Sequence, residues 1–200
     1  MYNRSSMTYQ KDKATQMLAY FTWKWTNPIS KLYLLKLVFL ADRFHLRKYG
    51  RSVCGDSYYA MSYGPVATNT KKLIEKELKT GTAGAFVKYA KIDGHDSVYA
   101  VSSPDMDVFS ETDREAMDAA LTLFSKHGGK IVDFTHKFPE WKKFEQDLEG
   151  GATRRKMRAI DFFESAGRAE YCDANKELVA LNKEFFIEQE EICNAFTAAA

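Results

Sequence analysis

The sequence lacks the cysteine pattern of a disulfide-bonded or zinc-binding protein. Its 200 residues include only three cysteines, Cys54, Cys172 and Cys193, which are far apart and odd in number. No C-x-x-C pair occurs, and no cysteine–histidine spacing fits a zinc site. These absences predict a reduced protein of the cytoplasm with three free thiols and no bound metal.

An excess of one charge and a long apolar run are also missing. Lys and Arg total 29 against 27 for Asp and Glu, and the formal net charge is +2. Nucleic-acid-binding domains usually carry a strong basic excess, so this balance disfavours a nucleic-acid partner. The longest apolar run, residues 32–41, is interrupted by Lys36 and is too short to span a bilayer, and the N-terminus has no apolar signal core. We therefore expect no membrane association.

Common enzyme motifs are absent as well. The chain contains no G-x-S-x-G sequence for a serine nucleophile. Residues 81–85, GTAGA, lack both the Walker lysine and the order G-x-G-x-x-G. We interpret this segment as a loop rather than a phosphate site, and we expect no cofactor.

What the sequence does contain is enough apolar material for a packed core. Hydrophobic residues make up 45% of the chain and aromatic residues 14%. Helical spacing and start signals predict helices at residues 14–25, 30–50, 65–79, 110–127, 130–136 and 139–148, with a Ser110–Asp113 capping box. Short strands are expected at residues 57–63 and in a hairpin around the turn DGHD at 93–96. The pattern predicts an α+β fold, mostly helical, with a small antiparallel sheet or hairpin.

A change in composition marks the expected domain boundary. LEGGATRRKM, starting at Leu148, has the composition of a linker. We predict a domain at residues 1–148, followed at 149–200 by a linker and a helical C-terminal extension. The extension should hold a short helix near residues 158–166 and a long one from about 173 to 196. On the long helix, Leu181, Phe185 and Ile192 form an apolar stripe that packs on the chain's own core or faces another chain.

The most polar stretch of the predicted core, residues 40–66, raises the question of catalysis. Asp42 and His45 are three residues apart on a helix, so their side chains can meet. A carboxylate that orients an imidazole is half of a catalytic arrangement, but no nucleophile accompanies it. The preferred interpretation is a structural hydrogen-bonded pair. An enzyme that uses Asp42 and His45, or a metal site completed by His136, is the less favoured alternative.

Two short basic clusters keep a nucleic-acid-binding regulator open as another alternative. One comprises Arg43, Arg47, Lys48 and Arg51, and the other lies in TRRKMR at residues 153–158. Such residues can contact phosphates. Cations are also favoured at helix C-termini, so solvated helix ends are the preferred interpretation.

One continuous region carries a family resemblance. It reads KLYLLKLVFLADRFHLRKYGRSVCGDSYYAMSYGPVATNTKKLI from Lys31 to Ile74. It resembles the signature of the Panacea domain family, also known through the SocA-type antitoxins. The matching positions are Lys31, Leu32, Lys36, Leu37, Ala41, Asp42, His45, Leu46, Tyr49, Gly50, Arg51, Gly55, Asp56, Tyr59, Ala60, Tyr63, Gly64, Pro65 and Val66. Phe39 departs from the commoner tyrosine, and THKFPEW, with His136 and Trp141, resembles a later family element.

The resemblance implies a function and a different role for the polar residues. It implies a non-enzymatic antitoxin, of a family found in phages, prophages and bacterial genomes, that neutralises a cognate protein toxin by direct binding. Because the toxins of such a family are diverse, a shared catalytic step is not expected. The polar set then defines the fold, with Asp42 accepting from a nearby Arg or His and Gly64-Pro65 forming a strand-to-helix turn. This leaves the partner-specific surface outside the signature. We place it in the extension, with Arg154, Arg155, Leu181, Phe185 and Ile192 as candidates for toxin binding or self-association.

Overall fold

The computed structural model describes residues 8–80 and 86–198, and the expected loop at residues 81–85 lies outside this range. The α-helices are α1 (Lys11–Trp25), α2 (Lys31–Tyr49), α3 (Thr68–Thr80), α4 (Glu111–His127), α5 (Ile131–Thr135), α6 (Pro139–Lys142), α7 (Glu145–Glu149) and α8 (Lys176–Ala198). Short 3-10 helices are η2 (Met106–Val108), η3 (Gly128–Lys130), η4 (Ala159–Phe163) and η5 (Gly167–Ala169). The strands are β1 (Ile29–Ser30), β2 (Tyr58–Met61), β3 (Gly64–Ala67), β4 (Val87–Ile92), β5 (His95–Ala100) and β6 (Arg155–Lys156).

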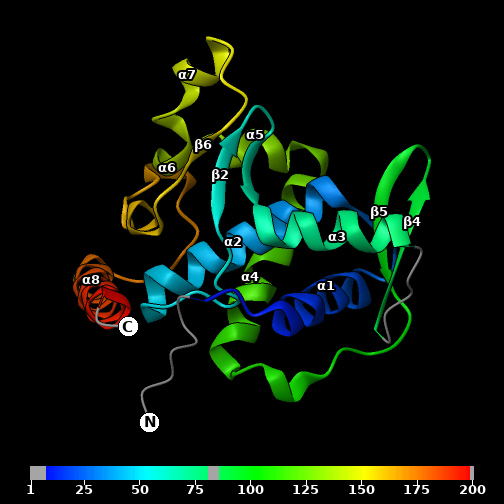
Figure 1. Cartoon of the computed structure of the whole chain (residues 1–200), viewed down its shortest axis with the longest axis horizontal. Coiled ribbons are helices and arrows are strands. Elements are labelled where there is room, and N and C mark those ends of the chain that lie inside the picture. The colour runs from blue at the N-terminus through cyan, green and yellow to red at the C-terminus, as the bar shows by residue number, and fades with distance from the viewer. Residues whose placement is uncertain (1–7, 81–85, 199–200) are drawn as a thin grey trace.

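Helix α2 runs through the middle of the molecule (Figure 1). Every residue from Leu34 to Arg47 is buried, because the helix is apolar over most of its circumference and is covered on several sides. It packs against α1, α4, α8 and the β3 strand. A helix buried all round forces its few charged residues into the interior, which sets up the polar contacts described below.

Several predicted elements are confirmed. The β4–β5 hairpin turns at Asp93 and Gly94, both with positive φ (49° and 79°), as a tight two-residue turn requires. The Ser110–Asp113 capping box opens α4 with both reciprocal hydrogen bonds in place. The predicted helix at 139–148 is instead divided into α6 and α7 around Lys143.

Two small antiparallel sheets complete the fold, in the orders β1-β5-β4 and β3-β2-β6. The second sheet corrects the prediction that Gly64-Pro65 starts a helix. Pro65 pairs with Ala60 inside β3, and α3 begins only at Thr68. Proline is tolerated there because β3 lies at the sheet edge, and Gly64 supplies the positive φ of 90° that the reversal needs.

The segment after residue 148 packs on the same core as the rest of the chain. Strand β6 pairs with β2, and η4 replaces the expected α-helix near residues 158–166. Phe162, Phe163 and Phe186 belong to one hydrophobic cluster with the residues of α2. The division at residues 148 and 149 stays a prediction. Within the described ranges, no helix is both long and apolar enough to cross a membrane.

Candidate functional site

Asp42 is fully buried on α2 and holds the loop that follows the helix. Its Oδ1 accepts from the backbone N–H groups of Val53 (2.8 Å) and Cys54 (3.2 Å), and its Oδ2 accepts from the Tyr58 hydroxyl (2.8 Å). Burial raises the pKa of Asp42 to about 6, although these three donors oppose the shift. Asp42 therefore fixes the path of the chain between α2 and β2.

His45 has different partners. Its Nδ1 donates to the Arg51 carbonyl (2.8 Å), and its Nε2 accepts from the Thr112 hydroxyl (3.0 Å). Burial lowers the pKa of His45 to about 4, which fits a neutral ring with Nδ1 protonated. The carboxylate beside it is Asp113, with Oδ1 at 3.3 Å from Nε2.

The predicted Asp42–His45 hydrogen bond is therefore wrong, and so is a bond from Asp42 to an arginine. The two helix positions are close enough to meet, but each side chain is saturated by a different loop or helix. His136 does not join them, since its ring stacks on Trp141 at a centroid distance of 3.9 Å. Burial raises the pKa of the Cys54 thiol, so Cys54 is no activated nucleophile. No cluster of three or more metal-ligating side chains occurs among the residues that the structure describes.

A second buried contact joins α2 to the β2–β3 hairpin. Lys36 is fully buried, and its Nζ donates to the Pro65 carbonyl (2.8 Å). A Cβ atom on Gly64 would lie 2.7 Å from this Nζ and 2.8 Å from the Thr135 hydroxyl, so only glycine fits. Burial lowers the pKa of Lys36 to about 7. Trp141 also holds the β2–β3 hairpin, because its Nε1 donates to the Met61 carbonyl (3.0 Å).

Several other signature residues lie at or near the ends of helices and strands. Asp56 accepts from the backbone N–H groups of Asn69 and Thr70, each at 2.8 Å, and so holds the start of α3. Tyr49 donates to Glu115, and its ring lies against His45 at 4.8 Å. The Nη1 atom of Arg51 is 3.0 Å from Asp113 Oδ1. Tyr59 is partly buried, whereas Tyr63 is 69% exposed at the hairpin turn.

Two residues of the first basic cluster, Arg43 and Arg47, are buried, whereas Lys48 and Arg51 are partly exposed. Arg43 is fully buried and donates from Nε to Glu140 (2.7 Å) and from Nη1 to Glu170 (2.8 Å). Arg47 is 3.1 Å from Glu170 and donates to the Glu164 carbonyl (2.8 Å). Both the phosphate-contact and the solvated-end interpretations are wrong for Arg43 and Arg47.

Sequence reasoning missed the carboxylate partners of this network, Glu140 and Glu170. Glu140 is fully buried on α6, and Glu170 comes from the segment between η5 and α8. A signal existed in Arg43, a cation on a helix with apolar residues on all sides, because a buried cation requires a buried partner. Nothing in the sequence identified which of the glutamates it would be.

The second basic cluster lies on the surface and is largely paired. Arg155 on β6 contacts Asp147 (2.7 Å), and Arg158 contacts Asp161 (2.8 Å). The Arg154 guanidinium lies over the ring of Tyr59, 5.3 Å from its centroid. Arg154 and Arg155 are therefore close to the β2 strand and not on α8.

Helix α8 divides its apolar residues between the core and solvent. Val179 and Phe186 are buried, and Phe186 packs against Phe163 at a centroid distance of 5.6 Å. The predicted stripe is on another side of the helix and is exposed: Leu181 at 61%, Phe185 at 48% and Ile192 at 40%. The stripe is therefore only partly packed on the chain's own core: a Cβ atom on Gly50 would lie 3.1 Å from Phe185 Cδ1, whereas Val179 and Phe186 are the buried apolar residues of α8.

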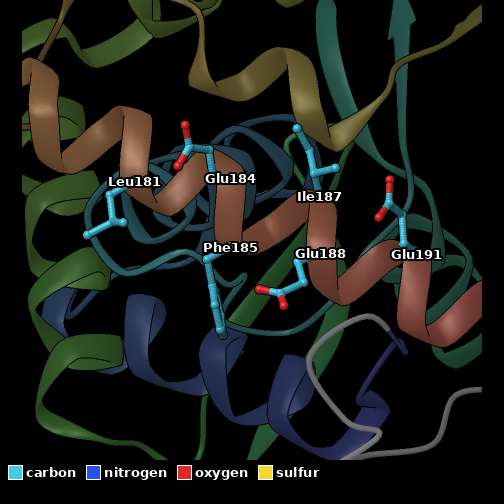
Figure 2. A pocket seen from close by; sticks show the side chains of 6 residues that line it. All are labelled: Leu181, Glu184, Phe185, Ile187, Glu188 and Glu191. Atoms are coloured by element: carbon cyan, nitrogen blue, oxygen red, sulfur yellow. The ribbon is translucent and has the colours of Figure 1, made fainter.

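The exposed side of α8 forms an open hollow with apolar and acidic walls. Figure 2 shows Leu181, Phe185 and Ile187 projecting from the helix, with Glu184, Glu188 and Glu191 between and beside them. Its six lining residues include no serine, cysteine, histidine or lysine, and no metal-ligand cluster occurs among the described residues. It offers apolar contact area bordered by carboxylates, which suits binding of another polypeptide.

One family model matches the part of the chain that contains most of α2. Residues 34–142 match the family model described as antitoxin SocA-like, Panacea domain, which is more than half of the chain. No curated protein and no solved structure matches the chain. The matched range includes α2, the β2–β3 hairpin and the buried Glu140, while α8 lies outside it. The chain therefore belongs to the SocA-like antitoxin family with a Panacea domain.

Proposed function

We propose that this protein is an antitoxin of the cytoplasm that neutralises a cognate protein toxin by direct binding, without catalysis, and that α8 supplies the main contact. The observation that carries the proposal is the row of exposed apolar side chains on α8, Leu181, Phe185 and Ile192. Large apolar groups on a surface mark interaction sites when they are contiguous.

The attachment of α8 favours such a role. Phe186 is buried on the core, and Asn182 Nδ2 donates to the Arg47 carbonyl (3.0 Å). The segment leading into α8 is held by Glu170, which the Arg43 guanidinium contacts with two nitrogens at 2.8 and 3.2 Å. A helix held in this way loses little conformational freedom on binding, which favours affinity.

The position of α8 outside the family match also favours it. Members that bind different toxins need different contact surfaces on a common fold, so specificity belongs outside the shared region. Arg154 and Arg155 lie on and beside β6, also outside the match, and are candidates for a secondary contact.

The alternatives receive less support from the same contacts. An enzyme that uses Asp42 and His45 would need these groups free to reach a substrate, and both are fully buried with protein partners. For a nucleic-acid-binding regulator, Arg43 and Arg47 are buried in ion pairs, and in the surface cluster Arg155 and Arg158 are paired with Asp147 and Asp161.

The test is co-expression with the protein encoded beside this chain, scored by growth and by co-purification. We expect the wild-type chain to restore growth and to co-purify. Phe185→Ser should leave the chain folded, with a smaller loss of melting temperature than Phe186→Ser, because Phe185 is 48% exposed and Phe186 is buried, but it should lose rescue and co-purification.

Two controls make the result specific. Trp23→Ser removes another exposed aromatic side chain, 45% exposed and on α1, and should rescue growth like the wild type. Phe186→Ser removes the buried neighbour of Phe185 and should lower the melting temperature. Failure of the wild-type chain to rescue or co-purify would contradict neutralisation of that toxin by direct binding. Full rescue by Phe185→Ser would contradict the role of α8.

A further inference from the structure

The exposed side of α8 combines two kinds of side chain in adjacent rows. Leu181, Phe185 and Ile192 form the apolar row. Beside it, Glu184, Glu188 and Glu191 line the hollow together with Leu181, Phe185 and Ile187 (Figure 2). In the described part of the chain these three carboxylates form no ion pair, in contrast to Glu170 in the interior. Their negative charge is therefore available to a partner.

The spacing along α8 is that of a helix–helix seam. Leu178, Leu181, Phe185, Glu188 and Ile192 follow one another in steps of three and four residues. This alternation keeps one face of a helix against a second helix. Glu188 occupies a position in the seam that is otherwise apolar, and a partner has to supply a cation opposite it.

The charge of the whole helix agrees with this requirement. Residues 176–198 contain five glutamates and two lysines. At 3.6 residues per turn, Lys176 and Lys183 lie roughly on the opposite side of the helix from Phe185. The seam is consequently anionic, although the complete chain has a formal net charge of +2.

We propose that the α8 seam binds a cationic amphipathic helix of the partner protein, with apolar residues against Leu181, Phe185 and Ile192 and lysine or arginine against Glu184, Glu188 and Glu191. This inference rests on the proposed function and names the chemistry of the toxin segment that α8 recognises. The mode is the docking of an amphipathic helix on an apolar strip, in which opposite charges set register and raise the association rate.

A second copy of this chain fits the seam poorly. Pairing of two α8 seams brings the glutamates of one copy towards those of the other, without a lysine of α8 on that side. Like charges that face each other across an interface are unfavourable, and the cost rises when Glu188 loses water. The same negative charge disfavours anionic lipid and nucleic acid.

The experiment uses the full chain and two synthetic helical peptides as probes. Both peptides carry leucine at heptad seam positions, and one has lysine and the other glutamate at the remaining positions. Fluorescence anisotropy should show binding of the lysine peptide, weakening as salt is raised from about 50 to about 300 mM, and no binding of the glutamate peptide. Glu188→Lys should weaken binding of the lysine peptide by roughly tenfold.

A matched charge change serves as the control. Glu149→Lys alters an exposed glutamate at the end of α7 and should bind the lysine peptide like the wild type. Circular dichroism should show that both variants are folded. Equal binding of the two peptides, or equal weakening by Glu188→Lys and Glu149→Lys, would overturn the inference. A dimer in sedimentation that Phe185→Ser dissociates would also overturn it, because the occupant would then be a second copy.

The peptide and growth assays separate the two proposals. Growth rescue by the wild-type chain tests neutralisation alone, and peptide binding tests the chemistry of the seam alone. Rescue by the wild type together with full rescue by Glu188→Lys would leave the antitoxin function standing and reject a cationic partner helix. Peptide binding without any rescue would do the reverse.

Discussion

Helix α2 buries charged side chains, whereas helix α8 exposes apolar side chains to solvent. On α2, Lys36, Asp42 and Arg43 are completely buried. On α8, Leu181 is 61% exposed, and carboxylates stand beside it in solvent. The first helix lies largely within the family match at residues 34–142, and the second lies outside it.

The difference separates contacts that define a fold from a surface that is free to change. Each of these three buried groups has geometrically defined partners: loop N–H groups and the Tyr58 hydroxyl for Asp42, the Pro65 carbonyl for Lys36, and two carboxylates for Arg43. Removing a charge from water is unfavourable, so such groups persist only where partners are in place, and they allow few alternative packings. Solvent-exposed residues of α8 have no such constraint.

The sharpest way to break this comparison is to remove Arg43. Arg43→Ala leaves Glu140 buried without its cation and should lower the free energy of unfolding by about 3–5 kcal/mol, measured by urea denaturation. Arg155→Ala breaks the exposed pair with Asp147 and should cost about 1 kcal/mol or less. Similar losses for the two variants would show that burial of the Arg43 network does not matter for stability.

A smaller effect is expected at Asp42. Asp42→Ala leaves the N–H groups of Val53 and Cys54 and the Tyr58 hydroxyl without their acceptor, which should cost about 2–3 kcal/mol. Asp42→Asn keeps an oxygen for the two backbone donors and should cost about 1 kcal/mol or less. Thermal unfolding of both variants checks the difference. An unchanged melting temperature for Asp42→Ala, with toxin neutralisation lost, would instead indicate a direct functional role.

Per pH unit, the smallest expected effect is the change in the free energy of unfolding that the titration of Lys36 causes. The unfolded chain keeps the lysine proton up to the ordinary pKa of 10.5, whereas the folded chain releases it above about 7. The unfolded state then binds more protons in this window, so raising the pH stabilises the fold, by at most about 1.4 kcal/mol per pH unit.

Lys36→Met removes this titration, so its comparison with the wild type isolates the slope. It also loses the hydrogen bond to Pro65, but that loss does not vary with pH. Between about pH 6 and about pH 9, the melting temperature of the wild type should rise relative to that of the variant as the pH increases. A constant gap between the two proteins would mean that Lys36 keeps an ordinary pKa in the folded state.

Local signals in the sequence predicted local structure well. The heptad-like spacing on α8, the Ser110–Asp113 capping box and the two-residue turn at Asp93-Gly94 are each decided by neighbouring residues. The mostly helical α+β class and the family followed from such patterns and from the signature on α2.

Local signals could not predict which residues distant in the sequence would become hydrogen-bond or strand partners. Asp42 and His45 had the right spacing for a pair, but the loop at Val53 and helix α4 at Thr112 offered better-placed groups. Pro65 fits a helix start and an edge strand equally well, and only pairing with Ala60 decides between them. The exposed side of α8 was ambiguous because Val179 and Phe186 provide a second apolar side.

The pairing of β6 with β2 bears on how this protein can be re-engineered. The chain returns to the sheet at Arg155 and Lys156, and Glu170 then enters the Arg43 network. Residues 149–172 are thus held by β2 and by Arg43, and α8 packs on both η4 and α2. Under the proposed role of α8, two such proteins should exchange specificity when they are joined just before α8. A junction at Gly150 and Gly151 would also replace Glu170 and so remove the partner of Arg43.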